Sequence, residues 1–277
     1  MTDISVLKAI ALGVIQGATE FLPISSSAHL VIFQHLFGID LEAGPIVAFD
    51  VCLHIGTLFA VLLALRQEVV LILRSIFSTR LTGADLEGGF STKTGRRAIW
   101  LILLGTLPAV VIGFSFKDFF EHLFTTTLPV GIALIATGCI LFATRFVKQN
   151  DVNLGQMRWW QAILVGLAQA LAIIPGISRS GSTIAMGIFT KLDYQLAAKY
   201  SFLLSVIAIG GAAILEVKNL RLLSEMNLWP VILGTLASFI VGYLCVRWML
   251  VIMRGHKFSW FAIYCWLVGA ITLYMSL

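Results

Sequence analysis

The sequence predicts an all-α polytopic membrane protein of two inverted-topology repeats, each a re-entrant helix hairpin plus three transmembrane helices. Three observations support this prediction. First, 59% of the 277 residues are apolar, only 12% are charged, and the mean hydropathy is +0.96, far outside the range of soluble domains. Second, six apolar stretches are long enough to cross a bilayer. Third, two further apolar stretches are broken by similar polar motifs.

The six unbroken stretches approach the roughly 20 residues that a membrane-spanning helix needs. They cover residues 48–65, 98–116, 128–147, 199–216, 230–250 and 259–277. The chain before Gln16 holds Asp3 and Lys8 and has no small-residue cleavage pattern. We therefore expect the first helix to be retained and not removed as a signal peptide.

The other two apolar stretches, residues 4–37 and 161–190, are interrupted by Pro23 and Pro175 with adjacent serines. Each interruption leaves two halves that are too short to span the membrane. We expect re-entrant helix–loop–helix hairpins, which a bilayer tolerates only where protein covers the loop or the loop faces water.

The two halves of the chain repeat one another. QGATEFLPISSSAH at 16–29 matches QALAIIPGISRSGS at 169–182, with the same spacing of nine from glutamine to serine, and LGTLPAVVIG at 104–113 reappears as LGTLASFIVG at 233–242. An odd number of spans per half inserts the second copy upside down. We expect one integral membrane domain over residues 1–277. Its two repeats are residues 1–147 and residues 158–277.

Lysine and arginine positions predict the orientation, because cytoplasmic loops are rich in both. If the 66–97 loop is cytoplasmic, fourteen of these residues lie on that side and four on the other, with Arg179 in a hairpin. Both termini and the mouth of the first hairpin then face outward, and the 66–97 loop is a solvated connector without a catalytic role. Since the basic residues flank apolar segments, the net charge of +5 indicates membrane orientation and not nucleic-acid binding.

Charged groups inside a bilayer are costly unless they have a function, which makes the two hairpins the candidate active site. In the first hairpin, Gln16 and Glu20 share a helix face, and the serines at 25–27 can cap the next half-helix. A helix N-terminus binds phosphate oxygens through its free N–H groups. In the second hairpin, Ser178 and Ser180 supply donors and Arg179 supplies a bidentate cation. Two opposed anion-binding ends would hold a doubly charged group.

The two motifs closely resemble the signatures of bacterial undecaprenyl-pyrophosphate phosphatases, the bacitracin-resistance family. The first family signature is similar to residues 16–29, and the second matches PGISRSGST at 175–183. The Phe49 region, residues 104–113 and the SFLL stretch at 201–204 fit as well, so the resemblance covers essentially the whole chain.

The resemblance implies removal of the terminal phosphate from undecaprenyl pyrophosphate at the outer, periplasmic face of the bacterial plasma (inner) membrane. This reaction recycles the lipid carrier of cell-wall sugars and confers resistance to bacitracin, which sequesters the substrate. The implied partners are the lipid substrate and membrane lipids. The sequence leaves open whether the chain acts alone or as a homodimer.

Carried onto this sequence, the resemblance makes Glu20 the family's acid, His29 its histidine, Arg179 its arginine and residues 25–27 its candidate hydroxyls. From these matches and the anion-binding helix ends we predict four catalytic residues and a phosphate-binding set. The catalytic residues are Glu20, Ser26, His29 and Arg179; the phosphate-binding set is Ser25, Ser27, Ser178, Arg179, Ser180 and Thr183. A divalent cation, Mg²⁺ or Ca²⁺, is expected on Glu20. The position that is often a second glutamate in the family is Gln16 here, and an amide is a poorer metal ligand. Asp50 is a further candidate ligand.

Our mechanistic hypothesis has Ser26 attacking the terminal phosphorus while His29, one helical turn away, handles the proton. Arg179 and loop N–H groups stabilise the phosphate oxygens, and Glu20 positions the cation or His29. The alternative is direct attack by water, with the serines only binding phosphate.

Structural explanations also exist for these residues. Glu20 and Arg179 could form an ion pair between the hairpins, the serines could be helix caps, and Asp50 and His54 could be a local hydrogen-bonded pair. A secondary transporter or flippase of an anionic or prenyl-phosphate substrate would also use broken helices in inverted repeats. The other membrane lipid phosphatase superfamily is disfavoured because the residues after Arg179 lack its histidine and aspartate.

Overall fold

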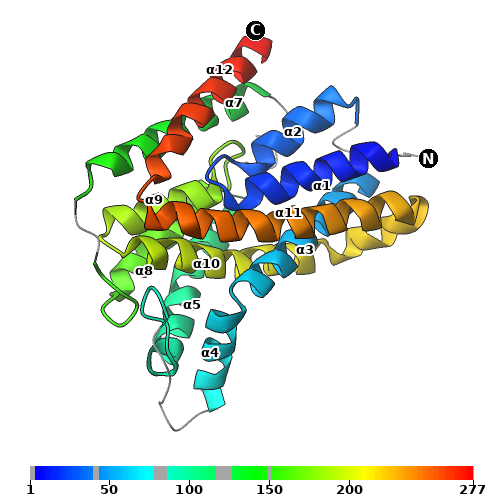
Figure 1. The fold of residues 1–277 in the computed structure, drawn as a ribbon. Coiled ribbons are helices and arrows are strands. Elements are labelled where there is room, and N and C mark those ends of the chain that lie inside the picture. Colours follow the sequence, from blue (N-terminus) through cyan, green and yellow to red (C-terminus); the bar gives the residue numbers. More distant parts are fainter. Residues whose placement is uncertain (1–3, 40–43, 78–85, 117–126, 149–150, 277) are drawn as a thin grey trace.

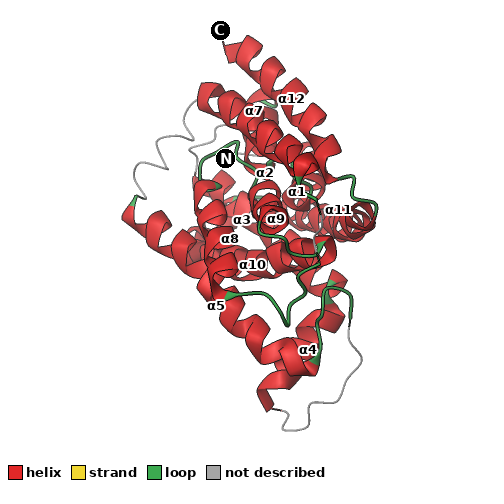
Figure 2. Ribbon diagram, turned by 90° about the vertical axis from the view of Figure 1, so that its left-hand side faces the viewer, coloured by secondary structure: helices red, strands yellow, loops and turns green. Residues whose placement is uncertain are grey.

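The computed structural model describes residues 4–39, 44–77, 86–116, 127–148 and 151–276, and these residues fold as a helical bundle (Figures 1 and 2). The first half of the chain forms α1 (Val6–Phe21), α2 (Ser26–Leu36), α3 (Gly44–Ala64), α4 (Arg66–Phe77), α5 (Thr92–Ser115) and α7 (Thr127–Ala143). The second half forms α8 (Trp159–Leu171), α9 (Arg179–Phe189), α10 (Tyr194–Leu215), α11 (Leu228–Arg254) and α12 (Phe261–Ser276). Short 3₁₀ helices cover Thr144–Phe146, Glu216–Glu225 and Phe258–Trp260.

The prediction of six long apolar helices is confirmed. Among the described residues, six helical segments have the length and composition to cross a membrane. They are Gly44–Ala64, Lys93–Ser115, Leu128–Phe146, Tyr194–Lys218, Leu228–Arg254 and Phe258–Ser276. Many of their large apolar side chains are exposed, as expected for a surface that contacts lipid.

Each broken apolar stretch forms two short helices joined by a tight loop. α1 has 16 residues and α8 has 13, so at 1.5 Å per residue they measure about 24 and 20 Å, less than the roughly 30 Å hydrocarbon core. α2 and α9 have 11 residues each and are shorter still. The helix–loop–helix form predicted around Pro23 and Pro175 is therefore present.

Helix packing is duplicated between the two halves. α1 packs along α11, and α8 packs along α5. The close approach occurs at corresponding glycines: a Cβ at Gly13 would lie 2.1 Å from the carbonyl oxygen of Gly234, and one at Gly166 would lie 2.3 Å from that of Gly105. Each pair consists of a glycine three residues before the hairpin glutamine and the glycine of the LGTL motif. The repeated sequence thus produces repeated backbone contacts, which only glycine allows.

The 66–97 segment differs from the connector that we predicted. Within it, α4 packs against α5, and the Nε of Arg96 donates to the carbonyl oxygen of Ser75 at 2.8 Å. Glu68 on α4 is buried and pairs with Lys199 of α10 at 2.7 Å. The hydropathy pattern did not predict this helix, because charged residues recur every few positions along it. A helix at the edge of a bundle needs only one apolar face for packing.

Candidate active site

The loop between α1 and α2 turns sharply at its serines. Ser25 has φ 69° and ψ 98°, an uncommon conformation for a residue with a side chain. Its carbonyl oxygen is held by Nδ1 of His29 at 2.8 Å, and its hydroxyl lies 3.2 Å from that of Ser27. Strained backbone that the surroundings hold in place is frequent at functional sites. The turn brings the N-terminus of α2 next to the end of α1.

The loop between α8 and α9 is shaped by Gly176 and Ser178. Gly176 has φ 97°, and a Cβ there would lie 2.5 Å from the carbonyl oxygen of Val130, so only glycine fits. The hydroxyl of Ser178 accepts from the backbone N–H of Gly181 at 3.0 Å and caps α9. Arg179 is the first residue of that helix, so its side chain leaves from the loop itself.

The two loops meet in space although about 150 residues separate them in sequence. The guanidinium of Arg179 donates through Nη2 to Oε1 of Glu20 and forms an ion pair with it. The hydroxyl of Ser180 donates to the carbonyl oxygen of Leu22 at 2.9 Å. The predicted meeting of the two hairpins is therefore present, with Glu20 and Arg179 as its charged pair.

Glu20 is the centre of the site. Its carboxylate is 5% exposed, and its Oε2 accepts from Nε2 of Gln16 at 2.8 Å and from the hydroxyl of Ser26 at 2.7 Å. Nε2 of His54 lies 3.8 Å from the same oxygen. The neighbouring guanidinium and these donors favour the ionised carboxylate. A carboxylate that accepts a hydrogen bond from a serine hydroxyl has the position of a general base beside a nucleophile.

A cavity of about 410 Å³ opens beside this cluster. Its polar wall is formed by Glu20, Arg179 and the three loop serines, together with Asp50 and His54 of α3. Part of its apolar wall comes from one side of α10, at Ala208, Ile209, Ala212 and Ala213. One polar end and one hydrocarbon side suit an amphipathic ligand with a charged headgroup.

His29 is not part of this cluster, contrary to our expectation that it approaches Ser26. The ring is 4% exposed; Nδ1 donates to the carbonyl oxygen of Ser25, and Nε2 lies 2.8 Å from the hydroxyl of Tyr264. Although one helical turn separates it from Ser26, His29 faces Tyr264 of α12. It lines a separate apolar cavity of about 970 Å³ instead.

His54 occupies the place that we had expected for His29. Its Nδ1 donates to the carbonyl oxygen of Asp50 at 2.8 Å, which leaves Nε2 directed at Glu20. The side chain is 36% exposed and borders the cavity. The sequence feature that could identify this histidine is its place four residues after an aspartate within an apolar stretch.

Three residues of the expected phosphate-binding set have structural contacts instead. Ser178 caps α9, Ser180 joins the two loops, and Thr183 donates to the carbonyl oxygen of Arg179 at 2.7 Å. All three are 1% exposed and lie outside the cavity wall. Ser25, Ser26, Ser27 and Arg179 do line the cavity. Sequence position alone could not distinguish the residues that line the cavity from those with structural contacts, because both groups lie near the starts of helices.

The candidate metal ligands lie at the site but do not form a protein cage. Among the described residues, no group of three or more histidine, cysteine, aspartate or glutamate side chains could hold a metal ion. Each carboxylate oxygen of Asp50 accepts a hydrogen bond from Nε2 of Gln34, at 2.8 and 3.0 Å. The buried Oε1 of Gln16 has no partner among the described residues. Glu216 also lines the cavity and was not expected from the sequence.

Comparisons with known proteins give one consistent result. A family model described as Bacitracin resistance protein BacA matches residues 9–271. An undecaprenyl-diphosphatase of Desulfatibacillum aliphaticivorans is 41% identical over 273 residues, covering 96% of this chain and 97% of the relative. Undecaprenyl-diphosphatases of Methanobrevibacter smithii and Alkaliphilus metalliredigens are 37% and 39% identical, with 98% of each chain covered.

Proposed function

The chain belongs to the bacitracin resistance protein BacA family, and we propose that its Glu20–Arg179 cavity hydrolyses undecaprenyl diphosphate to undecaprenyl phosphate and phosphate. The protein is a membrane hydrolase, and bacitracin resistance follows from its family. The observation that carries the site assignment is the serine–carboxylate–guanidinium cluster, in which Ser26 and Arg179 contact the same carboxylate of Glu20.

The terminal phosphate binds between Arg179 and the first turn of α2. Arg179 supplies positive charge, and its Nη1 has no partner among the described residues. The N-terminus of α2 supplies backbone N–H groups beside the hydroxyls of Ser26 and Ser27. The prenyl chain leaves the headgroup along the apolar wall from α10. This arrangement places the phosphoanhydride next to Ser26.

Ser26 attacks the terminal phosphorus, and Glu20 accepts the hydroxyl proton. A P–O bond forms to Ser26, the bridging P–O bond breaks, and undecaprenyl phosphate leaves with the bonding electrons. A water molecule then attacks the phosphoserine, which releases phosphate and returns a proton to the serine. The 2.7 Å hydrogen bond between Ser26 and Glu20 supports this assignment of the base. The competing route is direct attack on the terminal phosphorus by a water molecule that gives its proton to Glu20, with the serines only binding phosphate.

His54 is the histidine of this mechanism. Its Nε2 faces Glu20 and the cavity, whereas both ring nitrogens of His29 are engaged by Ser25 and Tyr264. His54 exchanges the proton that Glu20 collects, and His29 holds the strained backbone of Ser25. This assignment replaces the one that we drew from the sequence.

The donor set fits a divalent cation that arrives with the diphosphate. Mg²⁺ is commonly held by one or two carboxylates together with substrate phosphates, and the cavity offers Glu20 and Asp50 for this. When bound, the cation would neutralise charge on the phosphates. Glu20 already contacts three donors, so Asp50 is the more available oxygen ligand.

We place the protein in the bacterial plasma membrane with the cavity open to the outer face. Duplicated packing at Gly13 and Gly166 supports two repeats of opposite orientation, with the α1–α2 and α8–α9 pairs as re-entrant hairpins. The cation-rich ends of α3 and α11, near Arg66 and Arg254, are the cytoplasmic ends.

Phosphate release from undecaprenyl diphosphate by the purified full-length protein tests the proposal. Wild type should release phosphate, Ser26→Ala should lose at least about a thousandfold in kcat, and quenched wild-type reactions should contain phosphate on Ser26 by peptide mass spectrometry. Ser224→Ala is the matched control, because Ser224 is an exposed serine outside the cavity. A Ser26→Ala variant with most of its activity would leave water as the nucleophile. No release by wild type, with uptake into sealed vesicles, would indicate a carrier.

A further inference from the structure

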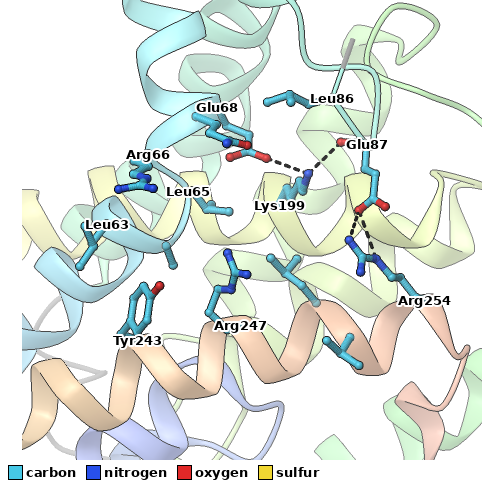
Figure 3. Close-up of a pocket in the computed structure, with 14 residues that line it drawn as sticks. Leu63, Leu65, Arg66, Glu68, Leu86, Glu87, Lys199, Tyr243, Arg247 and Arg254 are labelled. Atoms are coloured by element: carbon cyan, nitrogen blue, oxygen red, sulfur yellow. Dashed lines mark hydrogen bonds and ion pairs between the residues drawn. The ribbon is translucent and has the colours of Figure 1, made fainter. Parts of the chain in front are cut away.

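A second polar cavity lies at the other end of the bundle. It measures about 610 Å³ and is formed by the junction of α3 and α4, the start of α10, the end of α11 and residues 86–87 (Figure 3). α10 borders both cavities, through Lys199 here and through Ala212 at the Glu20 site. Thirteen residues of helix separate those two positions by about 20 Å. The second cavity is therefore a distinct site.

Positive charge exceeds negative charge in the wall of this cavity. Two of its cations are paired: Nζ of Lys199 lies 2.7 Å from Glu68, and Nη2 of Arg254 lies 2.7 Å from Glu87. The side chains of Lys199 and Glu68 are each 7% exposed, so this pair is built into the bundle. Nζ of Lys199 also donates to the carbonyl oxygen of Glu87 at 3.0 Å. These contacts hold this part of the cavity wall in place.

Three further donors lack a partner among the residues that the structure describes. Arg66 at the start of α4, and Arg247 and Tyr243 on α11, all line the cavity, and Figure 3 shows Arg247 and Tyr243 rising from the same helix toward the α3–α4 junction. None of the three has a side-chain hydrogen bond or ion pair within the described part of the chain. Two guanidinium groups and a phenol directed at one cavity match the oxygens of a phosphate group.

Hydrocarbon borders the same cavity. Leu63, Leu65, Leu250 and Val251 contribute to its wall. Leu63 and Val251 are 43% and 59% exposed, so an apolar path leads from the cavity to the surface that faces lipid. A small soluble anion would have no use for this path, whereas the chains of a lipid would cover it.

We propose that this cavity binds the phosphate headgroup of an anionic lipid, with Arg66, Arg247 and Tyr243 contacting the phosphate and the lipid chains lying against Leu63 and Val251. Basic cavities between transmembrane helices are known binding sites for lipid headgroups. The proposal does not depend on the hydrolysis reaction. It requires only that the free donors and the apolar wall act on one ligand.

Lipid titration of the full-length protein in detergent, followed by native mass spectrometry, tests the proposal. The probes are phosphatidic acid, phosphatidylcholine with the same chains, and inorganic phosphate, which separate headgroup charge from hydrocarbon. The variants are the double substitution Arg66→Gln and Arg247→Gln, and Tyr243→Phe. Arg74→Gln is the matched control, since Arg74 is an exposed arginine of α4 outside the cavity. Binding at the Ser26 cavity contributes equally to all variants.

Wild type and the Arg74 control should bind phosphatidic acid at least tenfold more tightly than the double variant, and Tyr243→Phe should lie between them. Phosphatidylcholine and inorganic phosphate should bind weakly to every protein, and phosphate release should stay within about twofold of wild type. Equal affinity of the double variant and the control would overturn the proposal, as would inorganic phosphate binding as tightly as phosphatidic acid. Tyr243→Phe keeps the test decisive if the double variant does not fold.

Discussion

Replacing the charged pair of the active site should expose an energetic coupling between the two halves of the chain. The perturbation is a double-mutant cycle with Glu20→Gln, Arg179→Gln and the two combined. The Glu20 side chain is 5% exposed and that of Arg179 is 16% exposed, so each single substitution leaves a largely buried charge without its partner. Breaking a buried pair in this way costs about 3–5 kcal/mol.

For one of the two single substitutions, the structure predicts a stability cost below that range. In Arg179→Gln, Glu20 keeps its hydrogen bonds from Gln16 and Ser26, so we expect a cost of about 2–3 kcal/mol. Glu20→Gln leaves the guanidinium without a counter-charge and should cost about 3 kcal/mol. The double variant removes both charges and should cost no more than either single substitution, which gives a coupling of at least about 3 kcal/mol.

Thermal unfolding of the purified proteins in one detergent measures this coupling. Each single variant should lower the midpoint by several degrees, at about 2–4 °C per kcal/mol for a chain of this size. The double variant should lower the midpoint by no more than either single variant, and thus by less than the sum of the two single losses. Phosphate release should fall strongly in all three variants, so the coupling is taken from the thermal midpoints and not from activity. If the double variant loses the sum of the two single losses, Glu20 and Arg179 do not act as a pair, and the reasoning is refuted.

Three further predictions concern packing, histidines and metal. Gly166→Ala should lower the thermal midpoint because its Cβ would meet the α5 backbone, whereas Gly211→Ala, with open space around it, should match or exceed wild type; equal midpoints would contradict the duplicated packing. His54→Gln should lower kcat by about a hundredfold, and His29→Gln should change mainly stability; the reverse order would return the proton to His29. A chelator should stop phosphate release reversibly without shifting the thermal midpoint, because the cation comes with the substrate; a lower midpoint would reveal a resident metal.

Much of the fold follows from patterns that the bilayer imposes on a sequence. Long apolar stretches placed the six helices, and Pro23 and Pro175 with their serines placed the two breaks. The repeated motifs predicted that Glu20 and Arg179 lie close together, because equivalent loops in two repeats can approach one another.

The remaining parts of the site depend on helix rotation, which spacing does not fix. His29 lies one turn from Ser26, but α2 is rotated so that the ring faces Tyr264 on α12. His54 comes from another helix, so only tertiary packing brings it to Glu20. Thr183 is a second example, since it lies outside the cavity wall and its hydroxyl is 2.6 Å from the hydroxyl of Ser201 on α10, within hydrogen-bond distance.

The central claim, that loops from both halves act on one diphosphate, is tested most directly by kcat/KM for phosphate release by Arg179→Gln. The ionic contact of Arg179 with Glu20 and its place in the cavity wall predict a loss of about 10²–10³-fold or more, since the guanidinium stabilises charge on the reacting phosphate. Arg74→Gln should match wild type. A kcat/KM for Arg179→Gln within about tenfold of wild type would contradict the account, because the first loop alone would then be sufficient for the reaction.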